Sequence, residues 1–268
     1  MATRSYRARG IVVRKTKLRE SDVIVTFLAE DGSPIRAVAK GARKPGGAFS
    51  SRLELLSTVE VLLAKGKSLD IVQEARVDNS HAILRSDAEK TLCALPVAEL
   101  IEKTMQDGLD NERLFPLFEA FLENLELASA KEGLALCGAA ILKIMAYLGF
   151  KPSLSSCVEC GRSIDLGGAS NTTMFSYVDG GAVCDECKGL HDVVGIATST
   201  LSWVHFLLYA TFKEIAHTNI DETASFSVLQ FSRFWIAMHA GVKVKSLEYL
   251  MTSEVFDSDA IDSERGKG

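Results

Sequence analysis

The chain has 268 residues and a formal net charge of −5, with 47% hydrophobic and 24% charged residues. These values are typical of a globular protein and exclude one dominated by disorder. No apolar run approaches the roughly 20 residues that span a bilayer, and the first ten residues lack the apolar core of a secretory signal. We therefore expect a cytoplasmic protein, without a membrane partner, whose six cysteines stay reduced.

Charge is distributed unevenly along the chain. Residues 1–52 contain twelve Lys and Arg against four Asp and Glu, which gives +8, and the remaining residues carry −13. An acidic protein is not the usual nucleic-acid binder. The separation nevertheless predicts a basic N-terminal module joined to an acidic body.

The basic N-terminal part is rich in β-branched residues with turn signals between them. Asp31-Gly32-Ser33-Pro34 is one such turn, and a glycine-rich basic loop covers 41–51. The pattern predicts strands over 9–14, 22–29, 35–40, 53–64 and 69–77. Five short strands in so short a stretch favour a small barrel or sandwich, and the oligonucleotide-binding (OB) fold has this strand count.

From residue 87 onward the apolar residues recur with a helical period. A first helix is predicted from residue 87, with Pro96 as a candidate kink. Four more are predicted over 114–127, 133–150, 200–215 and 226–239. Cys93 and Cys137 stand alone in apolar helical contexts and are expected in the core. His205 and His239 are expected to be core histidines of the last two helices.

Four cysteines form two C-x-x-C pairs, Cys157/Cys160 and Cys184/Cys187. Two such turns supply four thiolates to one tetrahedral ion, which predicts a structural Zn²⁺ in a zinc ribbon. A redox pair is the weaker alternative, because it would sit beside a βαβ pattern. A catalytic zinc is disfavoured, since four thiolates leave no position for water.

The predicted organisation is an α+β multi-domain chain. It comprises an OB-fold barrel over 1–80, an α-helical domain in two parts over 81–150 and 196–256, an inserted four-cysteine zinc ribbon over 151–195, and a disordered tail over 257–268. No metalloprotease spacing, nucleophile elbow or complete phosphate-binding loop occurs in the sequence. We therefore expect a protein that is not an enzyme.

Basic residues gather on the predicted strands and loops of the barrel. Lys or Arg in such a groove neutralises phosphates and binds nucleic acid with little sequence preference. The candidate DNA-binding residues are Arg36, Lys40, Arg43, Lys44 and Arg52, with Lys15, Lys17 and Arg19 in the preceding loop between strands. Tyr6 and Phe49 are candidate stacking partners. The alternative is an ordinary solvated surface.

Several motifs together resemble the bacterial RecO family of recombination and repair proteins. They are Leu148-Gly149-Phe150-Lys151-Pro152 followed by Cys157-x-x-Cys160-Gly161, then Phe175-Ser176, Gly180-Gly181 and Cys184-x-x-Cys187. Glu20-Ser21-Asp22 before a strand and Lys40-Gly41-Ala42-Arg43-Lys44 after another also match. The resemblance covers nearly the whole chain.

The resemblance implies an OB fold, a helical domain and, in many members, a zinc finger. It implies a nucleoid-associated protein that binds single- and double-stranded DNA and anneals complementary strands. It further implies that the protein binds RecR and the acidic C-terminal tail of the single-stranded-DNA-binding protein (SSB), and helps to load RecA onto SSB-coated strands. Lys143, Lys213 and Arg233 are candidates for the SSB tail. The alternatives are a zinc-containing protein-interaction scaffold and, less favoured, a nuclease.

Overall fold

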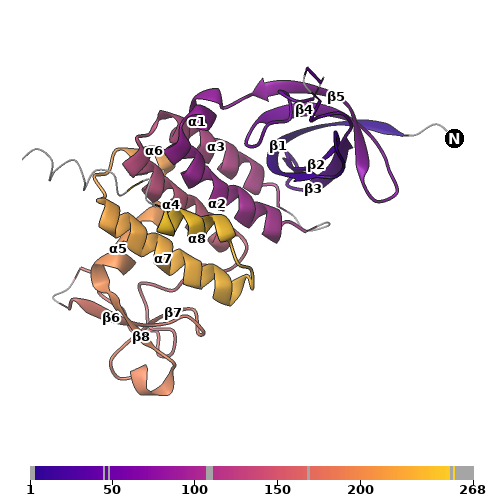
Figure 1. The fold of residues 1–268 in the computed structure, drawn as a ribbon. Coiled ribbons are helices and arrows are strands. Elements are labelled where there is room, and N and C mark those ends of the chain that lie inside the picture. Colours follow the sequence, from indigo (N-terminus) through magenta and orange to yellow (C-terminus); the bar gives the residue numbers. More distant parts are fainter. Residues whose placement is uncertain are drawn as a thin grey trace, which may run out of the picture. The chain divides into compact units, whose positions relative to one another are not determined.

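The computed structural model describes residues 4–44, 46–47, 49–106, 111–167, 170–253 and 256. The chain divides into two compact units, residues 1–127 and 128–268 (Figure 1). Within the described residues, the first unit contains five strands followed by three helices, and the second contains five α-helices and a three-stranded sheet. The division into units thus groups three helices with the strands. The predicted tail over 257–268 lies outside the described residues.

The five strands of the first unit form a closed barrel. They are β1 (Ser5–Lys17), β2 (Val23–Ala29), β3 (Pro34–Ala39), β4 (Thr58–Ala64) and β5 (Asp70–Asn79). Their order around the barrel is β1-β2-β3-β5-β4, and β3 with β5 is the parallel pair. A closed five-stranded barrel of this kind is the OB fold that the sequence predicts.

Alternation of side chains along the strands separates the barrel core from its outer surface. The inward side chains of β2 are Val23, Val25 and Phe27, all buried. On β3, Ala37 and Ala39 are buried, whereas Arg36 and the following Lys40 are exposed. The basic residues of β3 therefore lie on the outer row of the barrel.

The strand predicted from residue 53 is wrong at its beginning, because β4 starts only at Thr58, opposite Ile11. Leu53 is fully buried in the barrel core although it belongs to no strand. Leu56 has a left-handed backbone, with φ of 68°. Its N–H donates to the carbonyl of Val12 at 2.8 Å, which fixes the turn against β1. An apolar residue that closes a barrel end has the same sequence signature as a strand residue.

The helices of the first unit are α1 (Ala82–Ser86), α2 (Ala88–Thr104) and α3 (Leu114–Leu127). The Asp87 side chain caps α2 by accepting the N–H groups of its first turn, and Pro96 lies inside this helix. Helices α2 and α3 pack against β1 and β2. Ile11 and Leu28 are fully buried outside the barrel core cluster. The helices therefore cover the outer face of β1 and β2.

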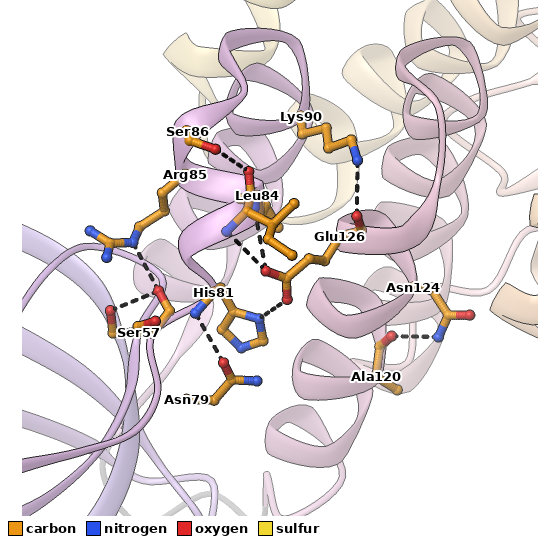
Figure 2. A network of polar contacts seen from close by, with 12 residues as sticks. Ser57, Asn79, His81, Leu84, Arg85, Ser86, Lys90, Ala120, Asn124 and Glu126 are labelled. Carbon is orange, nitrogen blue, oxygen red and sulfur yellow. Dashed lines mark hydrogen bonds and ion pairs between the residues drawn. The ribbon is translucent and has the colours of Figure 1, made fainter.

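A buried polar network joins the end of β5 to α1 and α3 (Figure 2). His81 precedes α1 with a left-handed backbone and supplies no side-chain cap. Glu126, near the end of α3, takes that role: Oε1 accepts the N–H groups of Ile83 at 3.1 Å and Leu84 at 3.4 Å. Its Oε2 lies 3.2 Å from Nδ1 of His81, and the His81 side chain is fully buried. A carboxylate from α3 thus caps the first helix after the barrel.

The second unit is built around α4 (Ala130–Tyr147), which packs against three other helices. These are α5 (Thr198–Tyr209), α6 (Phe212–Ala216) and α7 (Glu222–His239), and α8 (Lys245–Thr252) packs on α7. The single helix predicted over 200–215 is wrong, because Thr211 and Glu214 form a capping box that starts α6. Helices α1 and α8 are not among the predicted helices. Cys93 and Cys137 are fully buried, as predicted.

The chain between α4 and α5 contains a small antiparallel sheet in the order β7-β6-β8. Its strands are β6 (Thr172–Ser176), β7 (Gly181–Val183) and β8 (Val194–Ala197), and a 3-10 turn, η1 (Lys188–Leu190), follows β7. Phe175 of β6 packs edge-on against Phe231 and Trp235 of α7. The indole N–H of Trp235 donates to the carbonyl of Phe150 at 2.8 Å.

In the part of the chain that the structure describes, no helix is long and apolar enough to cross a membrane.

Candidate metal centre and nucleic-acid interface

The two C-x-x-C segments form tight turns that point four thiols at one another. The N–H of Gly161 donates to the carbonyl of Cys157, and the N–H of Cys187 donates to the carbonyl of Cys184, each at 3.0 Å. Gly161 has a φ of 71°, a left-handed conformation that a residue with a side chain rarely adopts. All four cysteine sulfurs lie within 4.8 Å of one another.

These sulfur positions fit a tetrahedral zinc ion. A Zn–S distance of about 2.3 Å places neighbouring sulfurs about 3.8 Å apart, and the Sγ atoms of Cys160 and Cys184 are 3.7 Å apart. All six cysteines are free, and 3.7 Å is far beyond a disulfide bond. Among the described residues, these four form the one group of His, Cys, Asp or Glu side chains gathered closely enough for a metal ion.

The backbone around the cysteines favours a thiolate at one of them. Burial raises the pKa of Cys157, but the N–H groups of Cys160, Cys184 and Glu159 outweigh it and lower the pKa to about 6. The N–H of Cys184 lies 3.4 Å from the sulfur of Cys157. Deprotonated sulfur is the form that binds metal. The donor set and its backbone are therefore suited to a bound cation.

Polar contacts outside the cluster join the two C-x-x-C turns. Arg162, next to the first turn, forms a bidentate ion pair with Glu186 of the second. His191 lies 2.8 Å from Asp179 and 3.3 Å from Glu159 through its two ring nitrogens. The Arg162–Glu186 pair thus joins the two turns from outside, and His191 links the first turn to the segment between β6 and β7.

The eight predicted DNA-binding residues are all exposed on the first unit. Five of them gather at one end of the barrel, where the ends of β1, β2 and β3 meet. Lys17 pairs with Val23, and Val23 pairs with Ala39. We call this group the cationic end; it consists of Lys17, Arg19, Lys40, Arg43 and Lys44.

Hydrogen bonds join the two loops of the cationic end. The N–H of Arg43 donates to the carbonyl of Ser21, and its Nη1 donates to the carbonyl of Glu20, each at 3.0 Å. The N–H of Gly41 donates to Oδ1 of Asp22 at 2.9 Å. The Glu20-Ser21-Asp22 motif and the Lys40–Lys44 motif, far apart in sequence, therefore form one structure.

The electrostatics of Asp22 follow from these contacts. The Gly41 N–H lowers the pKa of Asp22 most, burial opposes it, and the Ser21 hydroxyl and the charges of Arg19 and Lys40 lower it further. The carboxylate is therefore ionised while it organises the loops. Its negative charge partly balances the cations around it.

The other three candidates lie elsewhere or are already engaged. Lys15 forms an ion pair with Glu54 at 3.1 Å. Nη1 of Arg52 donates to the carbonyl of Ala75 on β5 at 3.3 Å. Arg36 lies within β3, opposite Thr26. The placement of Lys15 and Lys17 in a loop is wrong, because β1 continues through both residues.

A cleft beside β1 and β3 contains cations that the sequence analysis missed. It has a volume of about 1310 Å³, and its lining includes Arg36 together with Arg4, Arg7 and Lys65. Lys65 lies in the loop between β4 and β5, one of the loops through which OB folds bind ligands. Its place in that loop was the available sequence signal. Several carboxylates, Glu30 and Asp31 among them, also line the cleft, so its charge is mixed.

The two aromatic candidates do not present free ring faces. Tyr6 packs on the barrel core, its hydroxyl donates to Asp70, and the Lys65 ammonium lies 5.3 Å from its ring centroid. Burial, then the contact with Asp70, raises the pKa of Tyr6. Phe49 is half-buried against the same core. The structure therefore does not support stacking on either ring.

Some basic side chains of the N-terminal segment form ion pairs with carboxylates of the first unit. Arg9 lies 2.6 Å from Glu119, 2.9 Å from Asp78 and 3.3 Å from Glu30. Arg14 lies 3.1 Å from Glu102 of α2. The positive charge of the first 52 residues is thus partly balanced by carboxylates that follow later in the sequence.

The three candidates for an acidic peptide differ in their surroundings. Lys143 is half-buried and donates to the carbonyl of Leu208 at the end of α5 at 2.9 Å, while Lys213 is exposed on α6. Arg233 stacks on Phe234 at 4.8 Å and lines a cavity of about 710 Å³ with Lys243, Lys245 and Tyr249. A second cavity, of about 660 Å³, shares Gln230 and Met251 with it and is lined by aromatic residues. These aromatic residues are Tyr177, Phe226, Phe231 and Phe234.

Two family models match the chain. The model described as "Recombination protein O N terminal" matches residues 1–81, and "Recombination protein O C terminal" matches residues 85–248. The chain belongs to the RecO family. The RecO models meet near His81, where the barrel ends and α1 begins.

Curated members of the RecO family align with most of the chain. The protein named "DNA repair protein RecO" from Desulfitobacterium hafniense is 31% identical over 234 residues, which is 86% of this chain and 83% of that protein. Its namesake from Alkaliphilus metalliredigens is 30% identical over 246 residues, 89% of this chain and 96% of the relative. A RecO protein from Roseiflexus sp. is 33% identical over 190 residues, 71% of this chain and 65% of the relative.

Proposed function

We propose that this protein is a DNA repair and recombination mediator that binds single- and double-stranded DNA and anneals complementary strands. The observation that carries the proposal is the cationic end, which two family motifs build together through the contacts of Arg43 and Gly41. OB folds bind oligonucleotides on the face of strands 2 and 3 and on the adjoining loops. In this barrel, the outer row of β3 and those loops remain exposed.

Annealing by this route needs no catalytic residue. Cations that neutralise phosphates reduce repulsion between two strands and release counterions. The rate at which complementary bases meet then rises because the strands are held near each other. The protein therefore acts as a mediator and not as an enzyme.

The four cysteines hold a structural Zn²⁺ in this proposal. The ion would be bound by Cys157, Cys160, Cys184 and Cys187, and a closed shell of four thiolates serves folding rather than chemistry. The support is the fit of the sulfur positions to a tetrahedral ion.

We assign the SSB tail to the paired cavities beside α7. An acidic peptide that ends in an aromatic residue needs an apolar pocket beside basic side chains. The aromatic cavity offers the first, and Arg233 with Lys245 offers the second, beside Lys243, which is paired with Glu248 at 3.1 Å. Lys143 is the weaker candidate because its ammonium already binds a helix end. RecR is a further partner, and with it the protein helps to load RecA onto SSB-coated single strands.

Charge reversal at the cationic end tests DNA binding. Lys40→Glu with Lys44→Glu leaves the backbone contacts of Arg43 in place, so the fold should persist while the affinity for DNA falls. Each lost phosphate contact should also reduce the salt slope by about one. Fluorescence anisotropy with single- and double-stranded oligonucleotides measures both quantities. Arg76→Glu, an exposed arginine of β5 near Glu60, is the control.

Annealing of bare and SSB-coated strands then separates DNA binding from partner binding. The Lys40/Lys44 variant should lose both reactions, whereas Arg233→Glu should lose only the SSB-coated one. A wild-type protein that binds no DNA at physiological salt would overturn the proposal and favour the interaction scaffold. Strand scission with Mg²⁺ would instead favour a nuclease.

A further inference from the structure

An apolar side chain lies exposed among the cations at the start of the β1–β2 turn. Leu18 is 42% exposed. Within the described residues, it is the one large hydrophobic side chain of the barrel strands and their connecting loops that is so exposed; the others lie on helices or in the second unit. Isolated exposed hydrophobic residues are common on proteins, so the surroundings of Leu18 decide its meaning.

Backbone hydrogen bonds close this turn. The N–H groups of Leu18 and Arg19 both point to the carbonyl of Asp22, at 3.1 and 3.4 Å. Asp22 itself accepts the Gly41 N–H, and Ser21 accepts the Arg43 N–H. The backbone of the turn is therefore closed by its own hydrogen bonds and tied to the neighbouring loop, while the Leu18 side chain stays exposed.

Charges surround Leu18 on both sides. Lys17 and Arg19 flank it in sequence and both are exposed, and the charge of Arg19 also acts on the Asp22 carboxylate. Lys40 and Arg43 lie in the loop that is hydrogen-bonded to the turn. Apolar wedges that enter duplex DNA have this arrangement, in which a Leu, Ile, Phe or Met separates two bases while cations bind the adjoining phosphates.

We propose that Leu18 inserts between stacked base pairs of duplex DNA and unstacks them locally. This inference rests on the proposed function, because it requires the cationic end to bind DNA. Lys17 and Arg19 bind phosphates on the two sides of the opened step. Insertion removes the leucine side chain from water, and this gain offsets the lost stacking. Opening a step at the site where strands are held makes them easier to exchange.

Leu18→Ala is the test, with Leu18→Met as the conservative variant and Ile83→Ala as the control. Ile83 is an even more exposed apolar residue, on α1. The probe is a short duplex with 2-aminopurine at its centre, whose fluorescence rises when the base loses its stacking partner. Binding to the same labelled strand without its complement is measured in parallel by anisotropy.

Wild-type protein and Leu18→Met should raise the fluorescence of the duplex, whereas Leu18→Ala should not. Duplex affinity of the Ala variant should fall about tenfold, with single-strand affinity unchanged. Binding of the wild type without a fluorescence rise would overturn the wedge and leave DNA binding intact. An equal loss of affinity for both forms would also overturn it. Absence of all DNA binding would reject the proposed function itself.

Discussion

At the scale of single residues, His239 shows how packing alters a titration. Its ring lies 4.0 Å from that of Trp235 and 5.9 Å from that of Phe150, measured between centroids. Burial lowers the pKa of His239 below 6.5, and a hydrogen bond with the backbone of Tyr177 opposes the shift. Its Nε2 is buried and has no hydrogen-bond partner among the described residues. The expected pair of core histidines is therefore only partly right, since His205 is exposed.

This shift makes the stability of the second unit depend on pH. Below pH 6.5, His239 is protonated in the unfolded chain, whereas in the folded protein its lowered pKa keeps it neutral to lower pH. The free energy of unfolding should therefore fall as the pH drops through 6.5. His239→Gln should remove that part of the pH dependence. Denaturant titrations followed by tryptophan fluorescence, with zinc kept in excess, measure it. Identical pH profiles for wild type and variant would contradict the assignment.

At the scale of elements, α1 depends on a cap that another helix supplies. Glu126→Ala would leave the N–H groups of Ile83 and Leu84 without their acceptor and His81 without its carboxylate. We expect a loss of about 2 kcal/mol in the free energy of unfolding. Chemical denaturation measures it. Glu123→Ala, an exposed glutamate of the same helix, is the matched control, and an equal loss in both variants would contradict the capping role.

The elements also show what the sequence can and cannot predict. A run of β-branched and apolar residues predicts β2 closely, and alternation predicts β3. The 114–127 helix is predicted at its observed limits, because each signal is local. Leu53 was assigned to a strand because burial in a loop and burial in a strand select the same residue type. The Glu126 cap was missed because it joins residues that are more than 40 positions apart.

The same distinction applies to the candidate sites. The four cysteines were predictable because each C-x-x-C pair is local and the thiols have one common chemistry. For the basic residues, the sequence predicts a positively charged segment but not which side chains are free. The ion pairs of Lys15 with Glu54 and of Arg9 with Glu119 depend on the tertiary fold. Charge counts therefore overestimate the cations that are available to a ligand.

At the scale of the whole molecule, the metal centre and the cationic end belong to different compact units. We expect about one zinc per chain, and its removal by a chelator should unfold the β6–β8 sheet. DNA affinity should remain unchanged, because none of its proposed contacts lies in the second unit. Elemental analysis, circular dichroism and anisotropy measure these three quantities. Loss of DNA affinity on chelation, with the barrel still folded, would contradict this independence.

The covered outer face of β1 and β2 has a consequence for base pairing. Under the proposed function, a single strand bound along the outer row of β3 would lie on an open surface, because the neighbouring outer face of β1 and β2 is already covered by α2 and α3. Its bases would stay open to an incoming complement. A protein that encircled the strand would have to release it before pairing could begin, whereas under the proposed function this barrel would hold one strand while the second one arrives.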